Sequence, residues 1–276
     1  MGKWAKKSFG FEEIGNIGIV VAGTSVPKFE KLFVNMFDKI VSRRDRVYHS
    51  YIVKYKSNTF PIVFNVYGSP AMVDLLAVMH DGGCRNIIFL GAAYGGFKKL
   101  EIASLVIPKK SYHFEGIYHP INPDKKVSLP DKNLVIKLKE ILNKEGLKFE
   151  EGTNISVPAV TFQMPHANEE YKKLNPTTLE MELASCFSRA KEMGIRAAGV
   201  LWISDNRSSK IGDTKKKKLR IEKKKMLINA ITKNLKYFGD RLNIPYLFQV
   251  VLATGMDKQI GNARLISADK FLTGLI

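Results

Sequence analysis

The feature that most constrains the fold is a series of almost continuously apolar segments separated by longer amphipathic ones. Three of these segments are IGIVVAG (17–23), IIFLGAA (87–93) and AAGVLWI (197–203), and none contains a charged residue. A strand that is apolar at successive positions is buried on both faces, as it is when helices cover both sides of a sheet. Each segment is far shorter than the roughly 20 residues that cross a bilayer. The sequence therefore predicts an α/β sandwich.

Turn residues and the spacing of apolar residues predict the other elements. The expected strands lie at 17–23, in two runs of a hairpin within 46–68, and at 85–96, 103–114, 154–164, 195–206 and 243–255. The expected helices lie at 26–41, 69–83, 131–146, 183–194 and 215–238. Ser69 is expected to cap the second helix with Pro70 at its first position, and Asp131 to cap the third. Because no change in composition divides the chain, we expect one domain over residues 1–276.

The chain carries a formal net charge of +18, and much of it lies in KIGDTKKKKLRIEKKKM (210–226). Apolar residues in and just after this run predict a helix with a solvated basic face. They are Leu219, Ile221, Met226 and Leu227. No aromatic residues alternate with the lysines, so nucleic acid is not the expected partner. A basic field that attracts anionic substrates is the other interpretation.

The N-terminal segment and the cysteines indicate an intracellular protein. Glu12 and Glu13 follow the first lysines, where a signal peptide would have its apolar segment. Cys84 and Cys186 lack the spacing of metal ligands or of a redox pair, so we expect two buried thiols and no metal site. We therefore expect a cytoplasmic protein with no membrane partner.

The predicted strands end in polar or glycine-rich turns, where ligands of an α/β sheet gather. Four such turns are AGTS (22–25), GAAYGG (91–96), TFQM (161–164) and SDN (204–206). Each has a purely structural interpretation as well. A glycine after a strand can serve only the turn, and Asp205 can be the N-cap of the next segment.

The order and spacing of these turns resemble the nucleoside phosphorylase family of the purine nucleoside and uridine phosphorylase type. The corresponding motifs are VVAGTSVPK (20–28), VYGSPAMVD (66–74), IIFLGAAYGG (87–96), VTFQM (160–164), LEMELAS (179–185) and WISDN (202–206). The resemblance spans about residues 17 to 240, and EMEL together with ISDN is its most specific part. It implies a phosphorylase/hydrolase-like, three-layer αβα sandwich around a mixed central sheet. It also implies cleavage of purine nucleosides by inorganic phosphate, without a cofactor, to free base and ribose 1-phosphate.

The run Glu180-Met181-Glu182 carries the ribose site in this resemblance. Residues two apart on a regular helix point about 200° away from each other, so either one glutamate is a solvated surface charge or the segment is extended. The resemblance implies an irregular lead-in to a helix, with Met181 against the apolar side of the ribose. Glu182 then accepts hydrogen bonds from the ribose hydroxyls, and Glu180 is an auxiliary site residue. The alternative is a capping box formed by Thr177 with Glu180.

The resemblance assigns the base side of the site to Asp205, Phe162 and Asn206. A proton donated by Asp205 near N7 would neutralise the charge that develops on the leaving purine. Such an acid needs a raised pKa, which a buried strand end can provide. The uridine-cleaving branch lacks this aspartate, so purines are favoured, although uridine stays possible. Phe162 would pack on the base, or else belong to the core.

The phosphate side departs from the family pattern. Where the family has its first arginine, this chain has Pro27, with Lys28 one residue later. Where the family has its second arginine, this chain has Phe89. The residues expected to remain at the phosphate are Gly23, Gly91 and Arg46. Arg46 belongs to a cluster with Arg43 and Arg44 and would serve a neighbouring subunit's site. Lys28 or a lysine in 215–218 is a candidate to replace the arginines.

Three alternatives stay open at this point. One is a hydrolytic nucleosidase, although AGTSVPKF has no carboxylate before Glu30 that could activate water. The second is a catalytically altered member that only binds nucleoside, and the third is a nucleic-acid-binding module. Because family members build their sites across subunit interfaces, we expect a dimer-based homo-oligomer such as a hexamer.

Overall fold

The computed structural model describes residues 2–23, 27–97, 100–163, 168–207 and 216–239, which belong to one compact unit, Met1–Asp240. The strand expected at 243–255 lies outside the described residues. The prediction of a single domain over the whole chain therefore stays a prediction.

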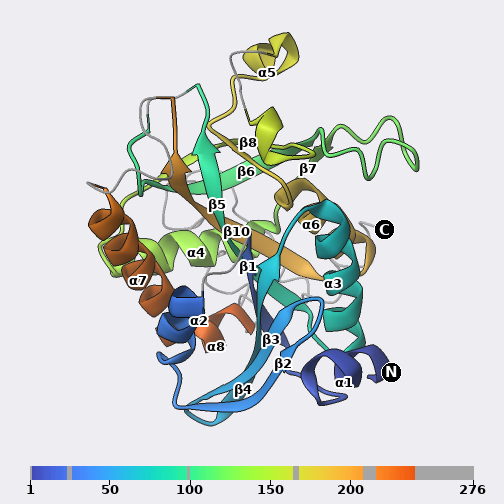
Figure 1. Cartoon of the computed structure of the whole chain (residues 1–276), viewed down its shortest axis with the longest axis vertical. Coiled ribbons are helices and arrows are strands. Elements are labelled where there is room, and N and C mark those ends of the chain that lie inside the picture. Colours follow the sequence, from blue (N-terminus) through green and yellow to red (C-terminus); the bar gives the residue numbers. More distant parts are fainter. Residues whose placement is uncertain (1, 24–26, 98–99, 164–167, 208–215, 240–276) are drawn as a thin grey trace, which may run out of the picture. The chain divides into compact units, whose positions relative to one another are not determined.

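Ten strands of the described part form one mixed sheet (Figure 1). They are β1 (Ile17–Ala22), β2 (Lys39–Asp45), β3 (His49–Tyr55), β4 (Asn58–Val66), β5 (Asn86–Gly95), β6 (Leu105–His113), β7 (Val127–Ser128), β8 (Phe149–Ser156), β9 (Thr178–Glu180) and β10 (Arg196–Asp205). The order is β10-β6-β8-β9-β5-β1-β4-β3-β2, with β7 beside β6. Since β10 also pairs with β5, the strands β5, β10, β6, β8 and β9 form a closed ring. The ring brings the carboxyl ends of β5, β9 and β10 to one place.

Helices cover both faces of this sheet (Figure 1). They are α1 (Lys3–Phe9), α2 (Pro27–Val34), α3 (Ser69–Asp81), α4 (Lys132–Lys144), α5 (Glu169–Leu174), α6 (Leu183–Glu192), α7 (Lys217–Lys233) and α8 (Leu235–Gly239), with a 3-10 helix, η1 (Val160–Phe162). One core lies under α1, α3 and α6, and the other under α2, α4, α7 and α8. Within β5, Phe89 faces the first core while Ile88 and Leu90 face the second. The predicted three-layer αβα sandwich is confirmed.

The hairpin within 46–68, the buried Cys84 and Cys186, and the cap at Asp131 are also confirmed. The Asp131 side chain accepts a hydrogen bond of 2.9 Å from the backbone N–H of Leu134. Ser69, in contrast, is not a cap, because α3 begins at Ser69 itself and Gly68 precedes it. None of the helices in the described part is long and apolar enough to span a membrane.

Three predicted elements have different bounds. The helix expected at 26–41 ends at Val34, and β2 begins at Lys39, where Ile40 and Val41 favour extended backbone that pairs with β3. The strand expected at 154–164 is β8 at Phe149–Ser156, because Pro158 has no N–H to continue the ladder. The helix expected at 215–238 is divided at Asn234 into α7 and α8.

Candidate active site

A cavity of about 570 Å³ opens where β1, β5 and β10 end, between the segment 180–182 and the helices α2 and α7. Its lining contains the carboxyl groups of Glu180, Glu182 and Asp205. The sheet register explains why they meet, since Tyr94 of β5 pairs with Asp205 on one side and with Leu179 on the other. The two motifs that carry the family resemblance therefore lie on opposite sides of one strand end.

Glu180 is a buried structural carboxylate. Its Oε1 accepts hydrogen bonds from the Asn154 amide at 2.7 Å and from the Ser156 hydroxyl. Its Oε2 accepts the backbone N–H groups of Glu182 and Leu183, both at 2.7 Å, and so caps the start of α6. With four donors on two oxygens, Glu180 has little capacity left for a ribose hydroxyl. Its predicted auxiliary role is therefore best described as support for the neighbouring residues.

The strand β9 ends at Glu180, and Met181 and Glu182 form an irregular lead-in to α6, as the family resemblance implied. Thr177 forms no capping box with Glu180, because its hydroxyl oxygen lies 3.3 Å from the N–H of Thr153. Instead, the turn between β4 and α3 holds the segment. The N–H of Gly68 donates to Glu182 Oε1 at 2.6 Å, and Ser69 Oγ donates to the Met181 carbonyl at 2.7 Å.

Glu182 keeps acceptor capacity toward the cavity. Among the described residues, its carboxylate accepts one further backbone hydrogen bond besides that from Gly68, a long one of 3.3 Å from the N–H of Met181. Burial and then the charge of Glu180 raise the pKa of Glu182. Burial also raises the pKa of Glu180, but its four hydrogen bonds oppose the shift. Because four donors point at Glu180, as an ionised carboxylate requires, we expect a proton shared by the pair to lie on Glu182.

Asp205 ends β10 at the cavity and is half-buried. Burial raises its pKa, while a hydrogen bond from Ser204 Oγ at 2.6 Å and the charge of Arg220 oppose the shift. Arg220 reaches from α7 and donates to the Ser204 carbonyl at 3.2 Å. The geometry gives Asp205 the property that the resemblance required, a carboxyl that holds its proton to a higher pH.

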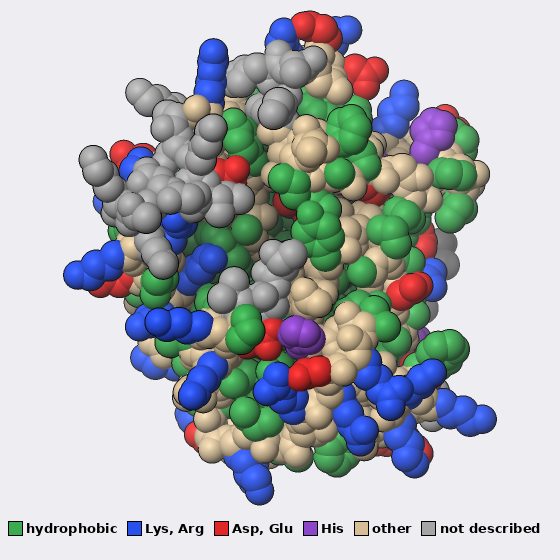
Figure 2. Space-filling model, viewed as in Figure 1, with side chains coloured by type: hydrophobic (Ala, Val, Ile, Leu, Met, Phe, Trp, Pro, Cys, Tyr) green, Lys and Arg blue, Asp and Glu red, His purple; other side chains and the backbone are tan. Residues whose placement is uncertain are grey.

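Basic and aromatic side chains form another part of the lining. Lys224 lies over the rings of Trp202, at 4.6 Å from the centroid, and Phe29, at 5.0 Å. Lys28 and Lys225 also line the cavity. Figure 2 shows Lys and Arg side chains over α7 and around the β2–β4 hairpin. The predicted apolar stripe of α7 is partly wrong, because Leu219, Ile221 and Met226 are exposed and only Leu227 is buried.

Several expected site residues lie elsewhere. Phe162 is 57% exposed and its neighbours Val160 and Gln163 line the cavity instead. The Asn206 amide donates to the Leu100 carbonyl at 2.8 Å, outside the cavity lining. The structure therefore gives no support to Phe162 and Asn206 as base contacts.

The expected phosphate residues are also separated. Gly91 is a packing position, since a Cβ there would lie 2.7 Å from the Phe89 ring. Gly23 does line the cavity, but its N–H is bonded to the Val66 carbonyl at 2.7 Å. Arg46 lies exposed between β2 and β3, and its role toward a neighbouring subunit stays a prediction.

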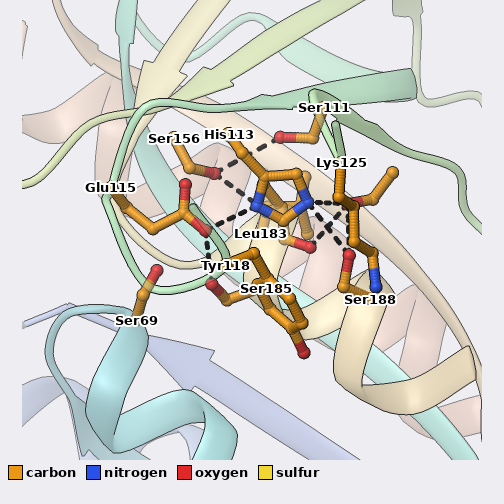
Figure 3. A network of polar contacts seen from close by, with 12 residues as sticks. Ser69, Ser111, His113, Glu115, Tyr118, Lys125, Ser156, Leu183, Ser185 and Ser188 are labelled. Carbon is orange, nitrogen blue, oxygen red and sulfur yellow. Dashed lines mark hydrogen bonds and ion pairs between the residues drawn. The ribbon is translucent and has the colours of Figure 1, made fainter. Parts of the chain in front are cut away.

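A second polar network lies beside the start of α6 and was not predicted from the sequence (Figure 3). His113 at the end of β6 contacts Glu115 through Nδ1 at 2.6 Å and Ser188 of α6 through Nε2 at 2.9 Å. Ser185 of α6 donates to Glu115 at 2.6 Å, and Ser128 of β7 contacts the same ring nitrogen as Ser188. The His113 and Glu115 side chains are almost completely buried and do not line the cavity. The network therefore fastens α6 to the sheet.

Trp202 and Lys224 line the cavity but were not predicted, because their sequence signals were ambiguous. Trp202 lies in a pattern typical of a buried strand. Gly68 and Ser69, which hold Glu182 and Met181 without being part of the lining, lie in a pattern typical of a helix start. Lys224 lies inside a run of lysines that resembles a solvated face. Among the described residues there is also no cluster of His, Cys, Asp and Glu side chains that could hold a metal ion.

Known proteins resemble this chain in sequence and in fold. A purine nucleoside phosphorylase of the DeoD type from Chromobacterium violaceum is 24% identical over 157 residues, which cover 56% of this chain and 66% of that protein. A protein of the same name from Streptococcus pyogenes serotype M5 is 23% identical over 179 residues, which cover 64% and 76% of the two chains.

Two crystal structures have similar folds. The Campylobacter jejuni 5′-methylthioadenosine/S-adenosyl homocysteine nucleosidase gives a TM-score of 0.68 at 16% identity, over 79% of this chain and 97% of that one. The Toxoplasma gondii purine nucleoside phosphorylase in complex with immucillin-H gives 0.69 at 18% identity, over 82% and 93%. At these identities the likeness concerns the fold alone. The family model of the phosphorylase superfamily matches residues 17–237, most of the sequence, and the chain therefore belongs to this superfamily.

Proposed function

We propose that the protein cleaves the N-glycosidic bond of purine nucleosides with inorganic phosphate, giving free base and ribose 1-phosphate. The observation that carries the proposal is one cavity that contains both Glu182 and Asp205. The first offers acceptor oxygens to hydroxyls, and the second is a carboxyl with a raised pKa. The names of the similar bacterial proteins agree with a purine nucleoside as substrate.

The reaction assigns one task to each residue. Glu182 accepts hydrogen bonds from two ribose hydroxyls, and Met181, also in the lining, packs on the sugar. As the bond between C1′ and the base breaks, its electron pair moves to the purine and Asp205 transfers its proton to N7. A phosphate oxygen then forms the new bond to C1′. Asp205 is left ionised and regains a proton from solvent before the next turnover.

Hydrolysis is the competing reaction, and the position of Glu30 supports phosphorolysis over it. A nucleosidase needs a carboxylate near the end of β1 to activate water, and Glu30 is the first acidic residue after β1. It is buried on α2, contacts His49 Nδ1 at 2.6 Å and accepts a hydrogen bond from Tyr51 at 2.9 Å. It does not line the cavity. Phosphate as the nucleophile needs no such base.

The test measures release of free base from inosine, adenosine, uridine and 5′-methylthioadenosine, each with and without phosphate. The proposal expects turnover of the purine nucleosides that depends on phosphate. Turnover that is the same without phosphate would establish hydrolysis instead. Absence of turnover with every substrate would refute cleavage and leave a protein that binds nucleosides.

A further inference from the structure

The cavity has a cationic wall, which we define as Lys28 of α2 and Arg220, Lys224 and Lys225 of α7. Arg220 and Lys224 are four residues apart, so they lie on the same face of α7. That face meets α2 and the end of β10, because Lys224 contacts rings from both elements. The wall is therefore a built part of the cavity lining and not a set of independent surface lysines.

Lys224 is the residue of this wall that most needs an anion. Its ammonium is largely removed from water, and burial, followed by the charge of Arg220, lowers its pKa to about 8. No acidic side chain in the described part of the chain forms an ion pair with Lys224, whereas Lys6, Lys125 and Lys139 each have one. The Lys224 ammonium lies over the faces of Trp202 and Phe29. Aromatic faces compensate a buried charge only in part.

The cavity lining contains groups of both charge signs. Glu182 and Asp205 supply carboxyl groups, and the cationic wall supplies the opposite charge to the same space. A ligand that fits both has hydroxyl donors in one part and concentrated negative charge in another. A sugar together with a phosphate group has this distribution, and a neutral nucleoside alone does not.

We infer that Lys224, assisted by Lys28 and Arg220, binds a phosphate group in this cavity. The choice of phosphate rests on the proposed function, but the anion site itself depends on the wall. In this arrangement α7 supplies the charge that the sequence lacks at Pro27 and Phe89. The phosphate group can belong to the inorganic co-substrate or to the 5′ position of a nucleotide substrate, and the two sources are separated by experiment.

Trp202 allows phosphate binding to be measured without catalysis. The chain has two tryptophans, and Trp4 on α1 is 66% exposed and outside the cavity lining. In a Trp4→Phe background, fluorescence therefore reports on Trp202 beside the Lys224 ammonium. Potassium phosphate is titrated at constant ionic strength and pH 7, and isothermal titration calorimetry of the same samples measures binding independently of the fluorescence response.

Lys224→Met removes the charge and keeps an apolar stem. Lys233→Met, on the exposed part of α7, changes the net charge equally and serves as the matched control. We expect Lys224→Met to weaken phosphate binding at least tenfold and Lys233→Met to change it less than twofold. If Lys224→Met does not fold, as judged by circular dichroism, Lys224→Gln is measured in its place. Equal affinity of the Lys224 variant and the control for both inorganic phosphate and inosine 5′-monophosphate, or no binding of either ligand by the parent, overturns the inference.

The pH dependence and the ligand source complete the test. Affinity should fall as pH rises from 7 to 9 in the parent, because the ammonium loses its proton, and should vary less in Lys224→Met. Inosine 5′-monophosphate is titrated beside inosine and inorganic phosphate. Lys224-dependent binding of inorganic phosphate supports the co-substrate, and Lys224-dependent binding of the nucleotide alone supports a nucleotide substrate. These readouts are binding constants and do not depend on catalysis. The anion site can therefore be confirmed even if no base is released and the proposed function is refuted.

Discussion

The two glutamates of the run Glu180-Met181-Glu182 should respond in opposite ways to the same substitution. Each Glu180 oxygen accepts two donors, and a glutamine has only one acceptor oxygen. In one orientation the NH₂ group of the Glu180→Gln amide faces the N–H groups of Glu182 and Leu183, and in the other it faces the Asn154 amide and a Ser156 hydroxyl that can turn to accept. The more favourable orientation therefore leaves at least one buried donor unpaired, so Glu180→Gln should lower the free energy of unfolding by about 1–3 kcal/mol.

Glu182→Gln loses much less. Its amide oxygen can keep the bond from Gly68, and only the 3.3 Å contact with the N–H of Met181 is given up. Since Glu182 is expected to hold its proton in the free protein at pH 7, a neutral amide replaces a neutral carboxyl group, so the free energy of unfolding should change by less than about 1 kcal/mol. Inosine binding, in contrast, should weaken strongly in Glu182→Gln, because a ribose hydroxyl loses a charged acceptor.

The assay is urea unfolding at pH 7 followed by circular dichroism, with inosine affinity measured on the same three proteins. A Glu180→Gln variant as stable as the parent would show that the shared proton lies on Glu180 and that the assignment of roles is reversed. A larger loss of stability in Glu182→Gln would refute the reasoning as well.

Three further predictions concern stability and pH. Asp131→Ala removes the cap of α4 and should lower the free energy of unfolding by about 1 kcal/mol, measured by urea unfolding. The raised pKa of Glu182 means that, above the ordinary glutamate value of 4.5, the folded protein holds a proton that the unfolded chain has lost. Stability should therefore be greatest below that value and fall as pH rises toward the folded pKa, and Glu182→Gln should flatten this slope in unfolding curves taken from pH 5 to 9. In the proposed reaction the acid form of Asp205 is the active one, so kcat/KM for inosine should be highest below its raised pKa and decline above it, and a rate that rises with pH in this range would contradict that role.

Much of the fold could be predicted because burial leaves a periodic trace in the sequence. The strands at 17–23, 87–93 and 197–203 are apolar at successive positions, and their side chains alternate between the two cores. The helix expected at 26–41 shows the limit of that signal. Apolar residues continue at helical spacing beyond Val34, but pairing with β3 draws residues from Lys39 onward into the sheet. Closure of the sheet through β10 and β5 depends on contacts that no local pattern contains.

The candidate site was predictable where a motif places a side chain through its own backbone. Glu182 and Asp205 reach the cavity because short irregular segments fix their direction. Phe162 does not, since its direction depends on how η1 turns after Pro158. Lys224 was not predicted as a site residue, because the sequence of a lysine run is the same whether its side chains are solvated or one of them packs over Trp202. Only the packing of α7 on α2 and β10 distinguishes them.

The most direct test of the central claim compares two substrates in the parent protein and in Asp205→Asn. Inosine needs a proton at N7 as the base leaves, whereas 7-methylinosine already carries a positive charge there and leaves as a neutral base. If Asp205 is the acid, Asp205→Asn should lower kcat/KM for inosine by roughly 100- to 10,000-fold and that for 7-methylinosine by only a few-fold. Equal losses for both substrates, or unchanged turnover of inosine, would contradict the account.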